Sequence, residues 1–284
     1  MEVIDLYAGC GGFSAGALMA GCRVIAGVDC DPSVLKAWEH NTGAKGTVAE
    51  LWKDTPAIPP ASANTHIHLS PPCTKLSRAN LARCQNAVCD ALHDISMAIE
   101  FTLDRGFTSW SLENVATRAT CSAFDAIASK HRGLVDYVVL DAVDYGCPSN
   151  RRRLIAGPPR LIDHLKQLKV PRVSVREAFA ARGVQVPALF IKNTARYKGV
   201  PTIRSVDGPC HTQVASNPLS WCTCDGVTVR DLYPSDVRVI MGFPDNWSLP
   251  EGNRKAVRAL GNAVPPPLAC SIMRAAMAAR LTSP

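Results

Sequence analysis

The sequence lacks a hydrophobic run long enough to cross a membrane, and it lacks the basic segment that begins a secretory signal. A membrane helix needs about 20 consecutive apolar residues, and no stretch of these 284 residues approaches that length. The first five residues, MEVID, include two acidic side chains and no basic one. We therefore expect a protein that is neither secreted nor bound to a membrane.

Internal repeats and low-complexity tracts are also missing, so a repeat architecture is not expected. The residues are 47% hydrophobic and 19% charged, which is an ordinary balance for a folded globular chain and excludes a disordered one. A length of 284 residues suits one α/β domain with a smaller appendage.

Zinc-binding spacings are missing too, although the chain contains 12 cysteines. Cys222 and Cys224, with Cys210 and His211 upstream, match no common zinc pattern, so we expect no metal. Most of the cysteines stand singly among apolar or small residues, as the reduced thiols of intracellular proteins do. We therefore expect a cytoplasmic protein in a prokaryotic, phage or viral context, or a nuclear one in a eukaryote.

Positive charge is concentrated between residues 158 and 204. The basic residues of this segment are Arg160, Lys166, Lys169, Arg172, Arg176, Arg182, Lys192, Arg196, Lys198 and Arg204. Only Asp163 and Glu177 oppose them, so the local excess of +8 is larger than the +7 of the whole chain. Such an excess fits either a polyanionic partner or a solvated surface, and charge alone favours neither.

Strand and helix patterns alternate over the first 157 residues. The expected strands are 2–6, 23–28, 65–69, 108–112, 137–140 and 153–156, and the expected helices are 13–20, 32–40 and 92–105. This alternation predicts an α/β fold with a doubly wound, mostly parallel sheet. After residue 158 proline and basic residues increase and periodicity weakens, with helices expected at 173–181, 231–241 and 271–280.

A glycine-rich turn, residues 8–12, joins the first expected strand to the first helix. Glycines let the backbone approach a ligand closely, and Asp29, which ends the second strand, is placed to hold ribose hydroxyls. Asp5 before the turn supports the same interpretation. The turn reads Gly-x-Gly-Gly and lacks the Gly-x-Gly-x-x-Gly of dinucleotide sites, which argues against a nicotinamide enzyme. A packing role for the glycines is the alternative.

Three polar segments lie at the ends of expected strands: residues 72–73, with Cys73, residues 113–115, with Glu113, and residues 151–153, with three arginines. Strand ends line the ligand crevice of an open α/β sheet, so we expect the three to converge. A cysteine, a carboxyl and a guanidinium around one pocket supply a nucleophile, a proton donor and a polar clamp. Taken singly, each has an ordinary structural explanation in a buried thiol, a surface carboxylate or an ion-paired loop.

In this order the segments resemble the motifs of the cytosine-C5 DNA methyltransferases, which use S-adenosylmethionine. The similar segments are 5–13 (DLYAGCGGF), 71–77 (PPCTKLS), 113–115 (ENV), 145–153 (YGCPSNRRR), 231–244 and 261–265 (GNAVP). The resemblance spans nearly the whole chain, and the set is specific although no single member is.

The resemblance implies a covalent mechanism on a cytosine that has left the duplex. The Cys73 thiolate adds to C6, Glu113 protonates N3, and Arg153, supported by Arg151, binds O2. C5 then takes the methyl group, which gives 5-methylcytosine and S-adenosylhomocysteine. The implied cofactor contacts are Asp5, Ala8, Gly9, Gly11, Phe13, Asp29, Cys30, Asn262 and Val264. The expected DNA contacts are Ser77, Arg78, Asn193, Arg196 and Lys198.

The resemblance also divides the chain into a catalytic and cofactor-binding domain (1–157), a small, irregular target-recognition region (158–228) and a C-terminal segment (229–284) that returns to the catalytic domain. Parts of 158–228 resemble family framework, so the expected readers are 183–199 and 216–226. Segments this short can contact few base pairs, so we expect them to recognise a short or degenerate DNA target. The expected partners are DNA and a companion restriction endonuclease, and we expect a monomer.

Some positions depart from the family pattern. Thr74 and Ser149 stand where glutamine is usual, and Leu76 stands where phenylalanine is usual. No glycine lies near Asn80 in the segment after the nucleophile, and residues 47–49 offer no aspartate for the adenine. None of these departures removes a group that takes part in covalent chemistry.

Three other functions stay open from the sequence. An RNA-methylating relative would use the same groups, but that branch usually has a Cys-Phe-Thr element, which is absent here. A catalytically silent DNA-binding paralogue would not need Cys73, Glu113 and Arg153. A small-molecule methyltransferase would leave the basic segment unexplained.

Overall fold

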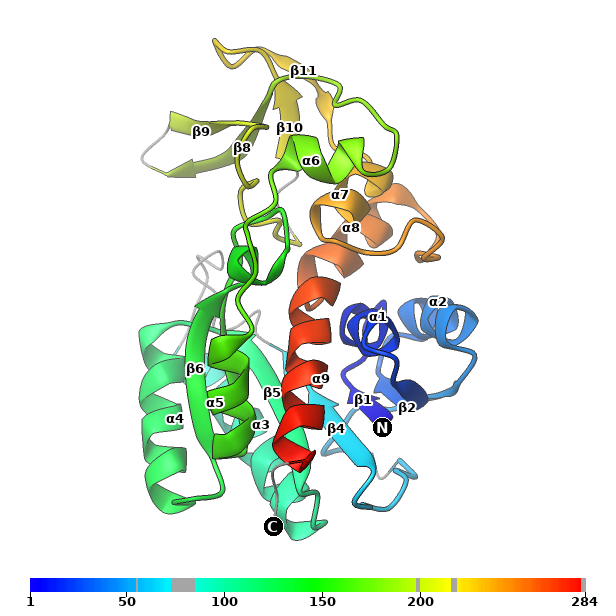
Figure 1. Ribbon diagram of the computed structural model, residues 1–284, viewed down its shortest axis with the longest axis vertical. Coiled ribbons are helices and arrows are strands. Elements are labelled where there is room, and N and C mark those ends of the chain that lie inside the picture. The colour runs from blue at the N-terminus through cyan, green and yellow to red at the C-terminus, as the bar shows by residue number, and fades with distance from the viewer. Residues whose placement is uncertain (55, 73–84, 198–199, 216–218, 282–284) are drawn as a thin grey trace.

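The computed structural model describes residues 1–54, 56–72, 85–197, 200–215 and 219–281. These residues form two sheets, one above the other in Figure 1. The larger sheet has, in spatial order, β3 (Lys45–Val48), β2 (Arg23–Asp29), β1 (Glu2–Leu6), β4 (Thr65–Leu69), β5 (Ser109–Val115), β7 (Arg152–Gly157) and β6 (Asp136–Asp141). The smaller sheet has β11 (Thr228–Asp231), β10 (Leu219–Cys222), β8 (Phe190–Tyr197) and β9 (Val200–Ser205).

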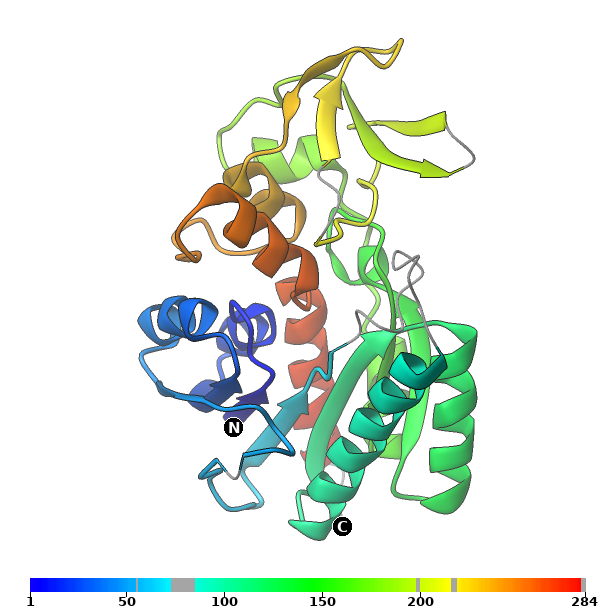
Figure 2. The ribbon, with the colours of Figure 1, turned by 180° about the vertical axis from the view of Figure 1, so that it is seen from behind.

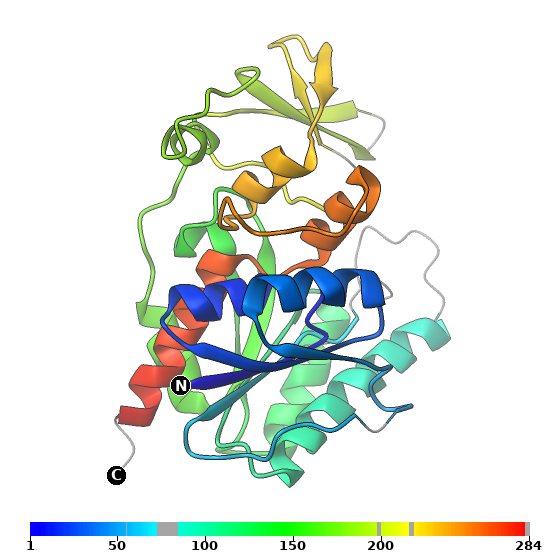
Figure 3. The ribbon, with the colours of Figure 1, turned by 90° about the vertical axis from the view of Figure 1, so that its right-hand side faces the viewer.

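Helices cover both faces of the larger sheet, as Figures 2 and 3 show. One face packs against α1 (Gly12–Met19), α2 (Pro32–Thr42), α5 (Pro159–Gln167) and α9 (Pro266–Leu281). The other packs against α3 (Gln85–Asp104) and α4 (Arg118–Lys130). No helix in the described part of the chain has the length and apolar content that a bilayer crossing requires.

A third core lies between the two sheets. It joins the smaller sheet to α6 (Val175–Ala180), α7 (Pro234–Ile240) and α8 (Asn253–Asn262), with Trp221 fully buried at its centre. The segment 158–228 is thus more regular than its sequence suggests, because antiparallel pairing of β8 with β9 and β10 satisfies its backbone.

The doubly wound, mostly parallel sheet predicted from the sequence is confirmed. Strands β3, β2, β1, β4 and β5 pair in parallel, whereas β7 runs antiparallel to both β5 and β6. The arginine segment reaches the crevice at the start of β7, where the expected strand 153–156 also begins, but this strand is antiparallel to its neighbours instead of parallel. Reversing the strand places its first residues at the edge where the parallel strands end.

Several elements differ from the sequence expectation. Strand β3 and helices α4, α5 and α8 were not predicted: β3 is short and half-exposed, whereas α5 and α8 are strongly amphipathic and carry a helical signal. Strand β5 runs on to Val115, so Glu113 and Asn114 lie inside it instead of following it. The 3-10 turn η1 (Ala142–Tyr145) connects β6 to the arginine segment.

Helices α1 and α9 pack closely because α1 contains glycines where they meet. A Cβ atom on Gly12 would lie 2.2 Å from the carbonyl oxygen of Val264, and one on Gly16 would lie 2.4 Å from the carbonyl oxygen of Pro266. Both contacts are with backbone, which cannot move aside as a flexible side chain can. The last of the sequence motifs, 261–265, thereby lies directly against the glycine-rich turn.

Replacing Gly16 by alanine should destabilise this contact. We expect Gly16→Ala to lower the free energy of unfolding by about 1–3 kcal/mol, the usual cost of overpacking, as measured by urea denaturation. Gly208→Ala is the matched control, since a Cβ there meets nothing within 4 Å. Equal stability of the two variants would contradict the close packing of α1 on α9.

Candidate active site

The glycine-rich turn is held by the acidic residue that ends β2. The Asp29 carboxylate accepts hydrogen bonds from the backbone N–H of Gly9 at 2.8 Å and of Asp31 at 2.9 Å. Gly9 has φ +52°, and a Cβ atom there would meet nothing within 4 Å, so open space lies above the turn. Ala8 and Gly11 are buried beneath it, and Gly11 packs against Trp247.

Two of the expected cofactor contacts point into the protein. Asp5 is 1% exposed, and its carboxylate accepts a hydrogen bond from Ser14 Oγ at 2.5 Å. Ser14 Oγ in turn accepts one from Trp38 Nε1 at 2.8 Å. The Phe13 ring is 2% exposed and stacks on His68, with 3.5 Å between ring centroids. The side chains of Asp5 and Phe13 therefore support the turn from below.

Burial raises the pKa of Asp5 to about 7, against the hydrogen bond from Ser14, which lowers it. Its pKa in the unfolded chain is 3.8, so between these values the unfolded state binds fewer protons and the stability falls as the pH rises. We expect Asp5→Asn, which cannot ionise, to gain stability over the wild type across this window, to a plateau on the order of 4 kcal/mol above pH 7. Urea denaturation between pH 4 and 8 measures the difference. The exposed control Asp163→Asn should follow the wild type, and a constant difference for Asp5→Asn would contradict a titrating Asp5.

Acidic groups gather beside the open space above the turn. Cys30 is exposed, and burial together with Asp29 and Glu50 raises the pKa of its thiol. Glu50, two residues beyond β3, is an acidic group that was not predicted for this site, since the expected aspartate position lies within 47–49. On the opposite side Val264 is buried against Gly12, and Asn262, the last residue of α8, is exposed.

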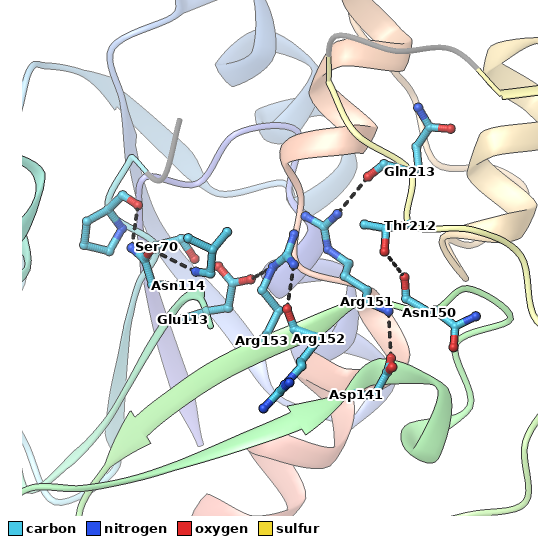
Figure 4. A network of polar contacts seen from close by, with 12 residues as sticks. Ser70, Glu113, Asn114, Asp141, Asn150, Arg151, Arg152, Arg153, Thr212 and Gln213 are labelled. Carbon is cyan, nitrogen blue, oxygen red and sulfur yellow. Dashed lines mark hydrogen bonds and ion pairs between the residues drawn. The ribbon is translucent and has the colours of Figure 1, made fainter. Parts of the chain in front are cut away.

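A buried ion pair joins β5 to β7, as Figure 4 shows. Arg153 Nε lies 2.6 Å from Glu113 Oε1, and the two side chains are 10% and 7% exposed. Glu113 Oε1 receives no well-aligned hydrogen bond from the described residues, so the contact is ionic and the oxygen keeps its capacity to accept one. Arg153 also donates from Nη1 to the carbonyl oxygen of Arg152 at 2.8 Å.

Arg151 is buried beside this pair and held by residues distant in sequence. Its backbone N–H donates to Asp141 Oδ1 at 2.7 Å, and its Nη1 donates to the carbonyl oxygen of Gln213 at 3.0 Å. Asp141 and Gln213 were not singled out from the sequence. A carboxylate at the end of a strand was the available signal for Asp141, whereas nothing local indicates the role of Gln213.

Asn114 ties the ion pair to the segment that precedes Cys73. Its Nδ2 donates to the carbonyl oxygen of Pro71 at 3.1 Å, so β5 and the end of β4 are fixed to each other (Figure 4). Of the expected site residues, Cys73, Ser77, Arg78 and Lys198 lie outside the described residues.

The basic segment is partly neutralised by carboxylates. Its paired residues are Lys166 with Asp136 and Asp163, Lys169 and Arg172 with Asp144, Arg176 with Asp207, and Arg182 with Asp245. Asn193 lies on β8, as does Arg196, and Lys192 donates to the carbonyl oxygen of Gly226. The charge excess counted along the sequence therefore overstates the positive charge available to a partner.

Comparisons with known proteins agree with the motif order. A family model for C-5 cytosine-specific DNA methylase matches residues 1–157 and 161–278. The chain belongs to the C-5 cytosine-specific DNA methylase family. It is a DNA cytosine-5 methyltransferase, and membership in the family implies S-adenosylmethionine as methyl donor.

Two relatives of this methyltransferase match nearly its whole length. It is 27% identical to the type II methyltransferase M.HgiDI of Herpetosiphon aurantiacus, over 95% of this chain and 92% of that protein. It is 25% identical to the type II methyltransferase M.AplI of Arthrospira platensis, over 96% and 85%. In structure it is similar to an Escherichia coli prophage protein described as a DNA modification methyltransferase, with a TM-score of 0.69, 18% identity and full coverage of both chains.

Proposed function

We propose that this methyltransferase acts on a cytosine turned out of the DNA duplex, through a covalent bond between Cys73 and C6. The buried Glu113–Arg153 pair supports this proposal most directly. It places a carboxyl of β5 and a guanidinium of β7 in contact at 2.6 Å, and the neighbouring Asn114 links β5 to Pro71, two residues before Cys73. A carboxyl able to reach N3 and a guanidinium able to reach O2 are what activation of the ring requires.

The proposed reaction assigns one task to each group. The Cys73 thiol gives up its proton and adds to C6, and Glu113 passes a proton to N3, which makes C5 electron-rich. Arg153 binds O2 and is oriented by its contacts with Glu113 and with the carbonyl oxygen of Arg152. S-adenosylmethionine supplies the methyl group that C5 takes. A water molecule then removes the C5 proton as the bond between C6 and the Cys73 sulfur breaks. N3 returns its proton to Glu113, and the products are 5-methylcytosine and S-adenosylhomocysteine.

The residues around the glycine-rich turn fit the donor. Gly9 leaves open space above the backbone, and Asp29 ends β2 beside it with a carboxylate suited to ribose hydroxyls. Gly11 belongs to the same turn, Cys30 follows Asp29, and Asn262 ends α8 two residues before Val264, which packs on Gly12. We propose these residues as the donor site, with Ala8 and Val264 packing beneath it and Asp5 and Phe13 acting through support of the turn.

We further propose that the smaller sheet and its loops read the DNA sequence, with Asn193, Arg196 and Lys198 among the contacts. The short readers favour a short or degenerate target. Because the curated relatives are named type II methyltransferases, a companion restriction endonuclease is part of the same proposal. Sequence-resolved methylation of DNA from expressing cells would contradict a short target if it found a long, fully specified site.

The decisive experiment offers the purified protein labelled S-adenosylmethionine with either duplex DNA or tRNA. We expect label in DNA, recovered as 5-methylcytosine after hydrolysis to nucleosides. Label recovered only in tRNA would instead establish the RNA-methylating alternative. Label in neither polymer, from a folded protein that binds the donor, would establish a silent or small-molecule-directed relative.

A further inference from the structure

A network of polar side chains, buried at its centre and half-buried at its two ends, runs along one face of β4 and β5. His66 contacts Ser109 Oγ through Nδ1 at 2.8 Å and Ser111 Oγ through Nε2 at 2.9 Å. His68 contacts the same Ser111 Oγ through Nδ1 at 2.8 Å and Ser70 Oγ through Nε2 at 2.8 Å. Four contacts of hydrogen-bond length thus connect Ser109, at the start of β5, to Ser70, just beyond the end of β4.

Both rings are fully buried and satisfied without charge. Burial lowers the pKa of His66 to about 3 and that of His68 well below its ordinary value. A neutral imidazole has one N–H and a hydroxyl has one O–H. The five groups therefore supply enough hydrogens for all four contacts, and the network needs no counter-ion. Such fully satisfied buried networks make a local structure rigid.

The surroundings of the network hold the rings in place. Phe13 stacks on His68 with an interplanar angle of 1° and lies 5.9 Å from the His66 ring centroid. On the neighbouring strand β1, Val3 is in register with His66 and Asp5 with His68. Asp5 is engaged by Ser14, and no ion pair to either histidine is found among the described residues.

Ser70, the last member of this hydrogen-bonded network, lies three residues before Cys73. The Ser70 N–H donates to the carbonyl oxygen of Leu6 at 3.2 Å, and the Pro71 carbonyl oxygen accepts from Asn114. With the His68 contact, residues 70–71 are fixed from β1, β4 and β5 at once. Proline at 71 and at 72 restricts the next two φ angles.

Such a network could act as a proton relay or as a positioning device, and the burial of the two imidazole rings favours positioning. A proton relay would place a proton on His68 or His66 in passing, and burial opposes that cation in both rings. A positioning role requires only that the four contacts between the histidines and serines are kept, with both rings neutral. We propose that His68, backed by Ser111 and His66, is a positioning residue for methyl transfer, which fixes Ser70 and so aims the segment that bears Cys73. This inference rests on the proposed covalent mechanism.

The test measures the single-turnover rate of covalent complex formation with duplex DNA containing 5-fluorocytosine, in the presence of S-adenosylmethionine. We expect Ser70→Ala and His68→Phe to slow this rate by about 10- to 100-fold, as expected when a reacting group is misplaced. The affinities for the donor and for DNA should change by less than about twofold. Ser70→Thr, which keeps the hydroxyl, and His68→Gln, which keeps a hydrogen-bonding group, should each restore part of the rate.

Control variants distinguish a loss of positioning from a general loss of stability and from the loss of a proton relay. Ser271→Ala removes another buried hydroxyl, which donates to the carbonyl oxygen of Pro267 within α9, and should leave the rate unchanged. Ser109→Ala removes the far end of the network and should cost less than Ser70→Ala. Equal losses from both ends, or a lower unfolding temperature with an unchanged rate, would overturn the inference. A wild-type protein that forms no complex would instead overturn the proposed function itself.

Discussion

Replacing Cys73 by serine should abolish methyl transfer, with a loss of at least about 10³-fold in kcat. A serine hydroxyl is far less nucleophilic at neutral pH than a thiol, and nothing else in the mechanism can form the bond to C6. The same substitution should eliminate the covalent complex with 5-fluorocytosine DNA, which persists in the wild type because fluorine at C5 blocks the elimination step. Transfer of labelled methyl groups to duplex DNA measures the first result, and denaturing gel electrophoresis measures the second.

The other described thiols make poor substitutes for Cys73. Burial raises the pKa of Cys10, Cys147 and Cys210 to about 12, so these thiols stay protonated. The matched control is Cys89→Ser, which changes an exposed thiol on α3 and should keep full activity. Turnover by Cys73→Ser, or loss of the covalent complex in Cys89→Ser, would contradict the assignment.

The sequence predicts the parts of the site whose partners lie nearby along the chain. The turn at 8–12 and Asp29 belong to adjacent strands of one βαβ unit, and the structure joins them through the Gly9–Asp29 hydrogen bond. Convergence of Glu113 and Arg153 was expected from strand ends in a parallel sheet. The structure brings them together by a different route, because β7 is antiparallel.

What the sequence does not predict depends on distant partners. Gln213 holds Arg151 across 62 positions, and the contact arises only when the chain returns from the smaller sheet. His66 and His68 occupy a strand that reads as apolar and β-branched, and their partners lie on β5, with a separation of 43 positions between His68 and Ser111. Strand register decides such contacts, and the register of β4 on β5, which are joined by a long crossover instead of a tight turn, is not evident from the local pattern.

Removing the Arg153 side chain should cost both stability and activity. Arg153→Ala would leave the Glu113 carboxylate buried without its cation, and breaking a buried pair in this way costs about 3–5 kcal/mol. It also removes the donor proposed for O2, with an expected loss of about 10²–10³-fold in kcat. Urea denaturation and methyl transfer to duplex DNA measure the two effects. Arg152→Ala, an exposed neighbour, should change stability by no more than about 0.5 kcal/mol.

A double-mutant cycle separates the two costs. Glu113→Gln alone should reduce kcat by about 10²–10⁴-fold, because it removes the proton donor to N3. The double variant, Glu113→Gln with Arg153→Ala, has no buried carboxylate charge at this place. Much of the stability lost in Arg153→Ala should therefore return, while kcat stays as low as in the less active single variant. The stability that returns measures the coupling free energy between Glu113 and Arg153, whose charged atoms lie 2.6 Å apart. Strictly additive losses of stability would show that Glu113 and Arg153 act independently, and would remove the main support for the proposed mechanism.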